Sequence, residues 1–252
     1  MSSLPVFREV FESDEPGSRV VALRSGPLVH VPRLLPSVAA GSPLADQLES
    51  VLERMRSIVR EAGGGLDDIA RVTLFMREVK DRRTLNDVWT RWFPDSGHRP
   101  PHKYVPADIP GGYAVMVDAL AVLGGERKTL KIAGVEHRDP MAMGARKGQL
   151  VCSSRLFTAE QSPGKQFSVL LEQARALMAE AGGDLSDLTQ VTVFAPTREA
   201  ATSMELLCRA HWADSERPPD LHVLVADLGG TGTCRIEVIG VLPDPAPSPA
   251  GG

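Results

Sequence analysis

The 252-residue sequence is poor in cysteine and aromatic residues, has no surplus of basic residues and contains no long hydrophobic run. Its three cysteines, Cys152, Cys208 and Cys234, are odd in number and lack C-x-x-C spacing, which argues against a disulfide framework and a zinc site. The formal net charge of −4 supplies no excess of cations for a phosphate backbone or an anionic bilayer. The apolar runs are strand-sized and too short to cross a bilayer. We therefore expect no nucleic acid and no membrane as partners.

Further absences bear on location and chemistry. The N-terminal stretch carries acids and a proline where a signal peptide needs an apolar segment, so a cytoplasmic protein is expected. The sequence has no metal-ligand cluster, no glycine-rich phosphate loop and no cysteine pair, so we expect no metal and no organic cofactor. His98 and His102 are four residues apart, but the prolines between them prevent a shared helix face, and both are expected to be solvated loop histidines.

The chain contains an internal repeat. Residues 47–75 align without a gap on residues 166–194, at an offset of 119 residues. Thirteen of the 29 aligned positions are identical, including the string E-A-G-G-x-L-x-D. A repeat of this length indicates that one domain was duplicated.

Each copy is predicted to contain two helices and a mixed sheet. Apolar residues recur at helical spacing over residues 48–59, and Gly63 follows where the helix should end. The β-branched run at residues 72–75 predicts a buried strand. Two strands before the first helix, a second helix and two closing strands complete the order β-β-α-β-α-β-β. This order is typical of an α+β fold with both helices on one face of the sheet.

Five segments follow from the repeat and from the composition. They are an N-terminal extension at 1–17, a first domain at 18–125, a linker at 126–138, a second domain at 139–243 and a disordered tail at 244–252.

Several ordered motifs resemble the YjgF/RidA (Rid) family of trimeric enamine/imine deaminases. In the first copy they are EAGGGLDDIARVTLF at 61–75, Asn86-x-Val88-Trp89, Phe93-Pro94 and the closing strand VMVDALA at 115–121; the second copy closes with CRIEVIG at 234–240. The resemblance implies two tandem Rid-like, chorismate-mutase-like domains that assemble as a homotrimer. It also implies a pocket for a small carboxylate substrate at each interface, where an enamine or imine is hydrolysed to a ketone and ammonia.

Asp118 and Glu237 fall on the strand position where the family has a glutamate that positions water, so the resemblance implies catalytic roles for both. An acid in an otherwise apolar strand is costly unless it is paired or useful. The alternative is an acid on an exposed face of the strand that pairs with a neighbouring arginine.

The arginine that binds the substrate carboxylate in the family has no direct counterpart. Matched on the Pro-Pro pair, its position holds Lys103 in the first copy and Leu221 in the second. When the copies are instead matched backwards from Ala107-Asp108 and Ala226-Asp227, the arginine position holds Pro101 in the first copy and Asp220 in the second.

The nearest guanidinium groups are those of Arg99 and Arg217, each just before a Pro-Pro pair, where an ordinary surface-loop role is equally expected. Around its Pro-Pro pair the first copy has Arg99, His102, Lys103 and Tyr104, which are polar groups able to meet an anion. The first copy is therefore predicted to bind substrate better than the second.

Both copies place an arginine, Arg33 or Arg155, where the family has a glycine. These arginines are either relocated anion-binding groups or partners of Asp108 or Glu237. A site formed where a first copy meets a second is also possible, with Arg155 and Glu237 serving a pocket lined by Arg99.

The function expected from the resemblance is that of a divergent Rid-like enzyme. It would act on a small carboxylate-bearing metabolite by imine or enamine hydrolysis or by a related proton-transfer step in a biosynthetic pathway. One alternative is a repurposed lyase, isomerase or cyclase on the same fold, as in the chorismatases, which also resemble two joined Rid-like domains. The other is a non-catalytic ligand-binding or scaffold protein.

Overall fold

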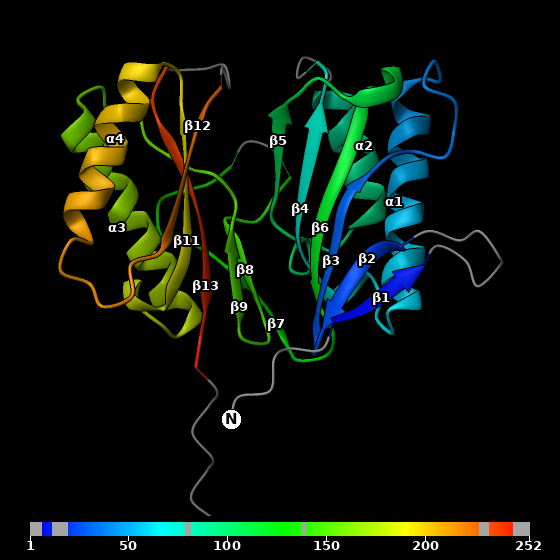
Figure 1. Cartoon of the computed structure of the whole chain (residues 1–252), viewed down its shortest axis with the longest axis horizontal. Helices are drawn as coiled ribbons and strands as arrows, with labels where there is room; N and C mark the ends of the chain where they lie inside the picture. The colour runs from blue at the N-terminus through cyan, green and yellow to red at the C-terminus, as the bar shows by residue number, and fades with distance from the viewer. Residues whose placement is uncertain (1–6, 12–19, 79–81, 138–139, 227–231, 244–252) are drawn as a thin grey trace, which may run out of the picture.

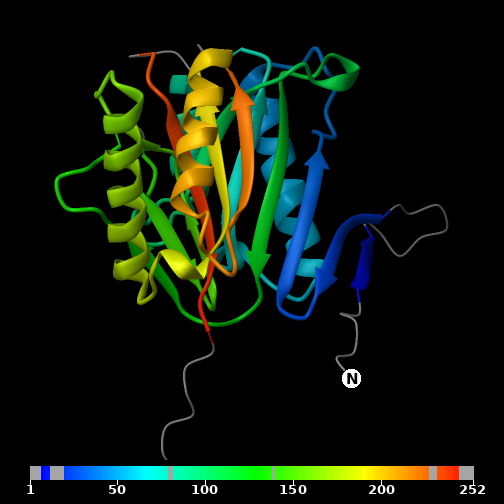
Figure 2. The ribbon, with the colours of Figure 1, turned by 60° about the vertical axis from the view of Figure 1, so that its left-hand side comes forward.

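The computed structural model describes residues 7–11, 20–78, 82–137, 140–226 and 232–243, which form two domains of the same α+β architecture (Figure 1). Both domains have the predicted order of strands and helices, so the predicted fold class is confirmed. The two sheets lie in the middle of the molecule, with α3 and α4 on one outer side and α1 on the other; Figure 2 shows the same arrangement from another direction.

The first domain is built on a six-stranded sheet with the order β1-β2-β3-β6-β4-β5, in which the β4–β5 pair is parallel. Its elements are β1 (Phe7–Phe11), β2 (Val20–Ser25), β3 (Leu28–Leu34), α1 (Leu44–Glu61), β4 (Ile69–Met76), α2 (Arg82–Trp92), β5 (His102–Pro106) and β6 (Val115–Val122).

The second domain repeats this arrangement in a sheet with the order β12-β11-β13-β9-β8-β7, in which β10 also pairs with β13. Its elements are β7 (Arg127–Leu130), β8 (Gly144–Lys147), β9 (Leu150–Ser153), β10 (Leu156–Phe157), α3 (Pro163–Ala181), β11 (Leu188–Ala195), α4 (Arg198–His211), β12 (Asp220–Val225) and β13 (Arg235–Val241).

Parts of two predicted connecting segments belong to the sheets. β1 lies within the predicted N-terminal extension and pairs with β2, and β7 lies within the predicted linker and pairs with β8. The predicted tail at 244–252 lies outside the described residues. The domain boundaries themselves stay predictions.

The repeated E-A-G-G-x-L-x-D string has a structural reason. Gly63 and Gly182 follow the first helix of each domain with φ of +94° and +89°, a left-handed conformation that glycine adopts without strain. The next glycine of the first copy, Gly64, packs against the Leu123 side chain with no room for a Cβ atom. The carboxylate of Asp68 then accepts a hydrogen bond from the Gly65 amide at 2.9 Å, which closes the turn into β4.

Candidate functional site

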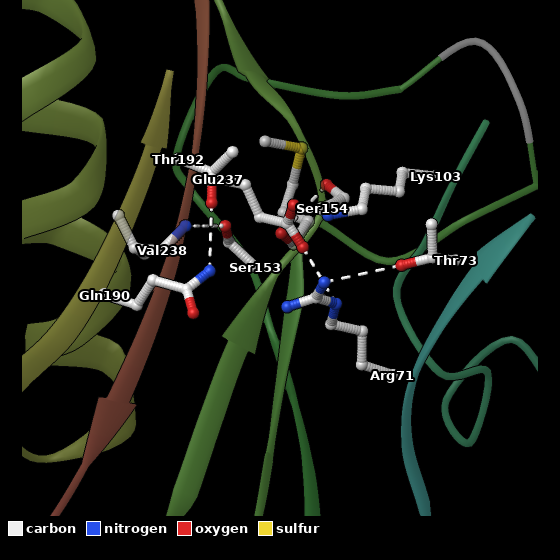
Figure 3. A network of polar contacts seen from close by, with 10 residues as sticks. Arg71, Thr73, Lys103, Ser153, Ser154, Gln190, Thr192, Glu237 and Val238 are labelled. Carbon is white, nitrogen blue, oxygen red and sulfur yellow. Dashed lines mark hydrogen bonds and ion pairs between the residues drawn. The ribbon is translucent and has the colours of Figure 1, made fainter. Parts of the chain in front are cut away.

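A buried ion cluster joins the facing sheets of the two domains. Glu237 on β13 has only 2% of its surface exposed, and its Oε1 atom lies 3.0 Å from Arg71 Nε on β4. Its other carboxylate oxygen pairs with the ammonium of Lys103 on β5. Figure 3 shows Glu237 with Arg71 and Lys103 on the opposing side of the cluster. One carboxylate of the second domain therefore meets two cations of the first.

The neighbouring charges keep Glu237 ionised although it is buried. Burial alone would raise its pKa, but the charges of Lys103 and Arg71 outweigh burial and hold the pKa below its ordinary value. Burial lowers the pKa of Lys103, and the Glu237 carboxylate opposes this change. A buried ion pair of this kind costs desolvation, and removing one partner leaves an uncompensated buried charge.

The equivalent acid of the first domain lies in different surroundings. Asp118 on β6 has a side chain that is 25% exposed, and it accepts a hydrogen bond from His30 Nε2 at 3.0 Å. This hydrogen bond raises the pKa of His30. The position equivalent to Arg71 in the second copy is Gln190, whose amide donates to Thr192. The second domain thus has the uncharged Gln190 where the first domain has Arg71, which pairs with Glu237 in the cluster.

A cavity of about 680 Å³ lies between the two domains. The first domain contributes residues of α2 and β5, and the second contributes the β9–β10 region, α3 and the start of β13. The lining residues are Arg82, His102, Tyr104, Gly134, Val135, Glu136, His137, Met141, Arg155, Phe157, Thr158, Ala159, Gln173, Thr233 and Arg235. Three arginines and one glutamate give this lining an excess of positive charge, which suits an anionic ligand.

Arg155 is the most buried of these arginines, with 9% of its surface exposed. It lies between β9 and β10, and its Nη2 atom donates to the carbonyl oxygen of Tyr104 at 2.6 Å. Its Nη1 atom is buried without a hydrogen-bond partner among the described residues. Burial, together with the charge of Arg235, lowers the Arg155 pKa to about 10, so the guanidinium remains charged at neutral pH.

His102 and Tyr104 lie two residues apart on β5 and both line the cavity. His102 Nε2 lies 3.1 Å from the Tyr104 hydroxyl, and that hydroxyl donates to Asn86 Oδ1 at 3.0 Å. The His102 ring also packs against Trp89, with 4.1 Å between the ring centroids. Burial lowers the pKa of His102 to about 3, so its ring is neutral. The prediction of a solvated loop histidine was wrong for His102, which is 1% exposed.

Two further groups of the lining can exchange protons. His137 Nε2 lies 2.5 Å from Ser154 Oγ, and its ring packs against Phe157. Glu136, the preceding residue, is exposed at the cavity.

Of the predicted substrate-binding residues, the structure brings Tyr104 and Arg155 together at the cavity and places Lys103 in the ion cluster. The Arg99 guanidinium instead donates to the carbonyl oxygens of Phe93 and Pro94, at 2.6 and 3.0 Å, where α2 gives way to the following loop.

Two other predicted residues lie on the surface. Arg33 is exposed at the end of β3, with a φ of +49°. Arg217 is exposed in the loop before β12, beside a separate cavity of about 350 Å³ that it does not line. Neither residue reaches the cavity between the domains, and neither do Asp118 and Glu237. The catalytic roles of these two acids stay predictions.

Sequence reasoning missed Arg71, Arg82 and Arg235. Arg71 is a charged residue between Ala70 and Val72 in a buried strand, and this pattern was a usable signal. Arg82 and Arg235 begin a helix and a strand, where a charged residue is common and gives no such signal.

No group of three or more His, Cys, Asp or Glu side chains placed to hold a metal ion occurs in the described part of the chain. None of the described helices is long and apolar enough to cross a membrane.

Comparisons with solved structures find proteins that cover about half of this chain. A YjgF/YER057c/UK114 family member from Mycobacterium tuberculosis is 25% identical, covers 47% of this chain and 100% of its own, and has a TM-score of 0.39. Yeast Mmf1 is 20% identical with the same coverages and a TM-score of 0.42.

Sequence comparisons find relatives of the same kind. A RutC family protein of Pyrococcus abyssi is 30% identical over 53 residues, 21% of this chain and 42% of that protein. The 3-aminoacrylate deaminase RutC of Acinetobacter baylyi is 31% identical over 81 residues, 30% of this chain and 64% of that protein. The chain thus spans less than half the length of the first relative and less than two thirds of the second.

A family model described as Endoribonuclease L-PSP matches residues 21–123, which is the first domain. The first domain therefore matches the YjgF/RidA family, and the second half of the chain contains a repeat of part of its sequence.

Proposed function

We propose that the cavity between the domains binds a small carboxylate-bearing metabolite and that the protein hydrolyses an imine or enamine of such an acid. The observation that carries the proposal is Arg155, a buried, charged guanidinium that lines the cavity and whose Nη1 atom has no partner among the described residues. The name of the relative from Acinetobacter baylyi, 3-aminoacrylate deaminase, supports the same class of substrate.

The binding step follows from the geometry of Arg155. Its hydrogen bond to the Tyr104 carbonyl fixes the guanidinium plane before any ligand arrives, so little side-chain entropy remains to be lost. A buried donor without a partner costs about 1–3 kcal/mol, and a carboxylate oxygen placed on Nη1 removes this cost. Arg82 and Arg235 add positive charge that attracts the same anion.

The reaction adds water to the imine carbon, after which the carbon–nitrogen bond breaks and a ketone and ammonia leave. An enamine first takes up a proton on carbon to become the imine. The addition needs a group that accepts a proton from water and a group that gives one to nitrogen. Glu136 and His137 line the cavity and are of the residue types that do this near neutral pH. We propose Glu136 and His137 as the proton-transfer groups.

A second function, ligand binding without catalysis, is favoured by the state of Glu237. Its carboxylate is paired with two cations and lies outside the cavity lining, so a role in positioning water would require the cluster to open. Formation of ammonia separates the two functions.

The test combines binding and turnover in matched variants. Arg155→Met removes the proposed anchor, and Arg217→Met removes an exposed arginine of the same chain as the control. Titration calorimetry with lactate should show binding in the wild type and in Arg217→Met, and an affinity at least tenfold lower in Arg155→Met, about 1.4 kcal/mol.

Imines generated in situ by an amino-acid oxidase should release ammonia faster with wild type than with Glu136→Gln. Binding that survives Arg155→Met would exclude the proposed site, and unaltered ammonia release with every variant would favour binding without catalysis.

A further inference from the structure

Two residues that line the same cavity, Arg155 and His102, each carry a buried polar atom without a hydrogen-bond partner among the described residues. The first atom is Arg155 Nη1, a hydrogen-bond donor, and the second is His102 Nδ1, whose protonation state is derived below. Arg155 belongs to the second domain and His102 to the first, so the cavity brings them together only because the two domains meet there. A buried polar atom normally has a hydrogen-bond partner. The chemistry of these two atoms therefore indicates which ligand groups would supply their missing hydrogen bonds.

The hydrogen bonds of Tyr104 set the tautomer of His102. The Asn86 Oδ1 atom only accepts, so the Tyr104 hydroxyl must donate its proton there. The same hydroxyl oxygen then accepts from His102 Nε2, which must carry the ring proton. Because the ring is neutral, its Nδ1 atom has no proton and presents a lone pair. His102, which lines the cavity, therefore carries a buried hydrogen-bond acceptor at Nδ1.

Tyr104 also contacts both residues that carry the unpartnered atoms. Its carbonyl oxygen holds Arg155 and its hydroxyl holds His102, so one residue of β5 positions both groups. The stacking of His102 on Trp89 restricts rotation of the imidazole ring. The acceptor and the donor are thus fixed before a ligand enters.

We infer that His102 is a specificity-determining residue that selects carboxylates carrying an N–H or O–H group beside the carboxylate. The carboxylate binds Arg155 Nη1, and the adjacent N–H or O–H donates to His102 Nδ1. This inference rests on the proposed function and narrows its substrate class. Imines and enamines of small acids carry such an N–H, whereas the ketone formed from them has lost it. The ketone oxygen then faces the His102 lone pair, which favours release of the product.

Three acids of the same carbon skeleton test the inference in the unaltered protein. Lactate has a hydroxyl donor beside the carboxylate, pyruvate has a carbonyl acceptor at that position, and propionate has neither. Titration calorimetry should give the affinity order lactate, propionate, pyruvate, with lactate about tenfold tighter than pyruvate, the worth of one hydrogen bond.

Variants assign the preference to His102. His102→Phe keeps an aromatic ring against Trp89 but removes the acceptor, so lactate and pyruvate should bind with similar affinity. Tyr104→Phe keeps His102 but frees its Nε2 atom, so both tautomers become available and the preference for lactate should fall. Arg155→Met should lower the affinity for all three acids by a similar factor. Circular dichroism of each variant checks that it folds.

The ring nitrogens of the wild type give a readout that needs no variant. In ¹⁵N-labelled protein, the His102 Nδ1 resonance should be that of an unprotonated nitrogen, and lactate should shift it while pyruvate should not. Pyruvate binding as tightly as lactate, with both lost in Arg155→Met, would overturn the role of His102 and leave the proposed carboxylate site standing. No binding of any of the three acids would overturn the proposed function and the inference with it.

Discussion

Replacing Glu237 with glutamine removes the carboxylate from the cluster that joins the two domains and leaves Lys103 and Arg71 without their counter-charge. Their side chains are 8% and 12% exposed, so water compensates little of this loss. Breaking a buried ion pair costs about 3–5 kcal/mol, and the glutamine oxygen still accepts one hydrogen bond, so a loss near 3 kcal/mol is expected. With a urea slope of about 3 kcal/mol/M, the unfolding midpoint should fall by about 1 M.

The matched control is Asp118→Asn at the equivalent position of the first domain. Asp118 and its partner His30 are 25% and 44% exposed, and an exposed pair contributes only about 0–1 kcal/mol. Urea unfolding followed by circular dichroism compares the two variants with the wild type. Equal shifts of the two midpoints would refute the reasoning that burial makes the Glu237 cluster costly to break. Adding Lys103→Met to Glu237→Gln removes one uncompensated cation and should recover part of the stability.

Two predictions concern pH and assembly. Because Asp118 raises the pKa of His30, this pair stabilises the fold while His30 is protonated and Asp118 is ionised, and the stability is lost as the pH rises through the raised pKa of His30. The urea midpoints of wild type and Asp118→Asn should differ most at about pH 6 and converge at high pH, and a constant difference would contradict this. We also propose that chains associate as trimers, because apolar side chains are exposed on strands of both sheets, among them Leu23, Leu28, Leu224 and Val225. Light scattering should give a mass of three chains, and a monomer at micromolar concentration would contradict the proposal.

The repeat made most of the fold predictable. A match of 29 positions fixed two helix–strand units, and the alternating apolar residues around them predicted the remaining strands. The edge strands β1 and β7 were not predicted, because both are short: β1 has five residues between segments that gave no strand pattern, and the mostly polar β7 resembles a linker.

The site was predictable only in part. An acid in an apolar strand correctly marked Glu237 as unusual, but its partners come from the other domain, and a pairing between domains leaves no local pattern. Arg99 looked like an anion-binding group because the carbonyl oxygens that occupy its guanidinium belong to a loop whose path the sequence does not reveal. Arg155 was a candidate in the sequence, and what made it convincing was its burial at the cavity.

The central claim is that the cavity between the domains holds a carboxylate on Arg155. A crystal structure of the chain soaked with lactate tests it most directly. We predict that the lactate carboxylate lies within hydrogen-bond distance of Arg155 Nη1, with the lactate hydroxyl on the side of His102. A carboxylate bound at Arg99 or Arg217 instead, with the cavity free of lactate, would contradict the account.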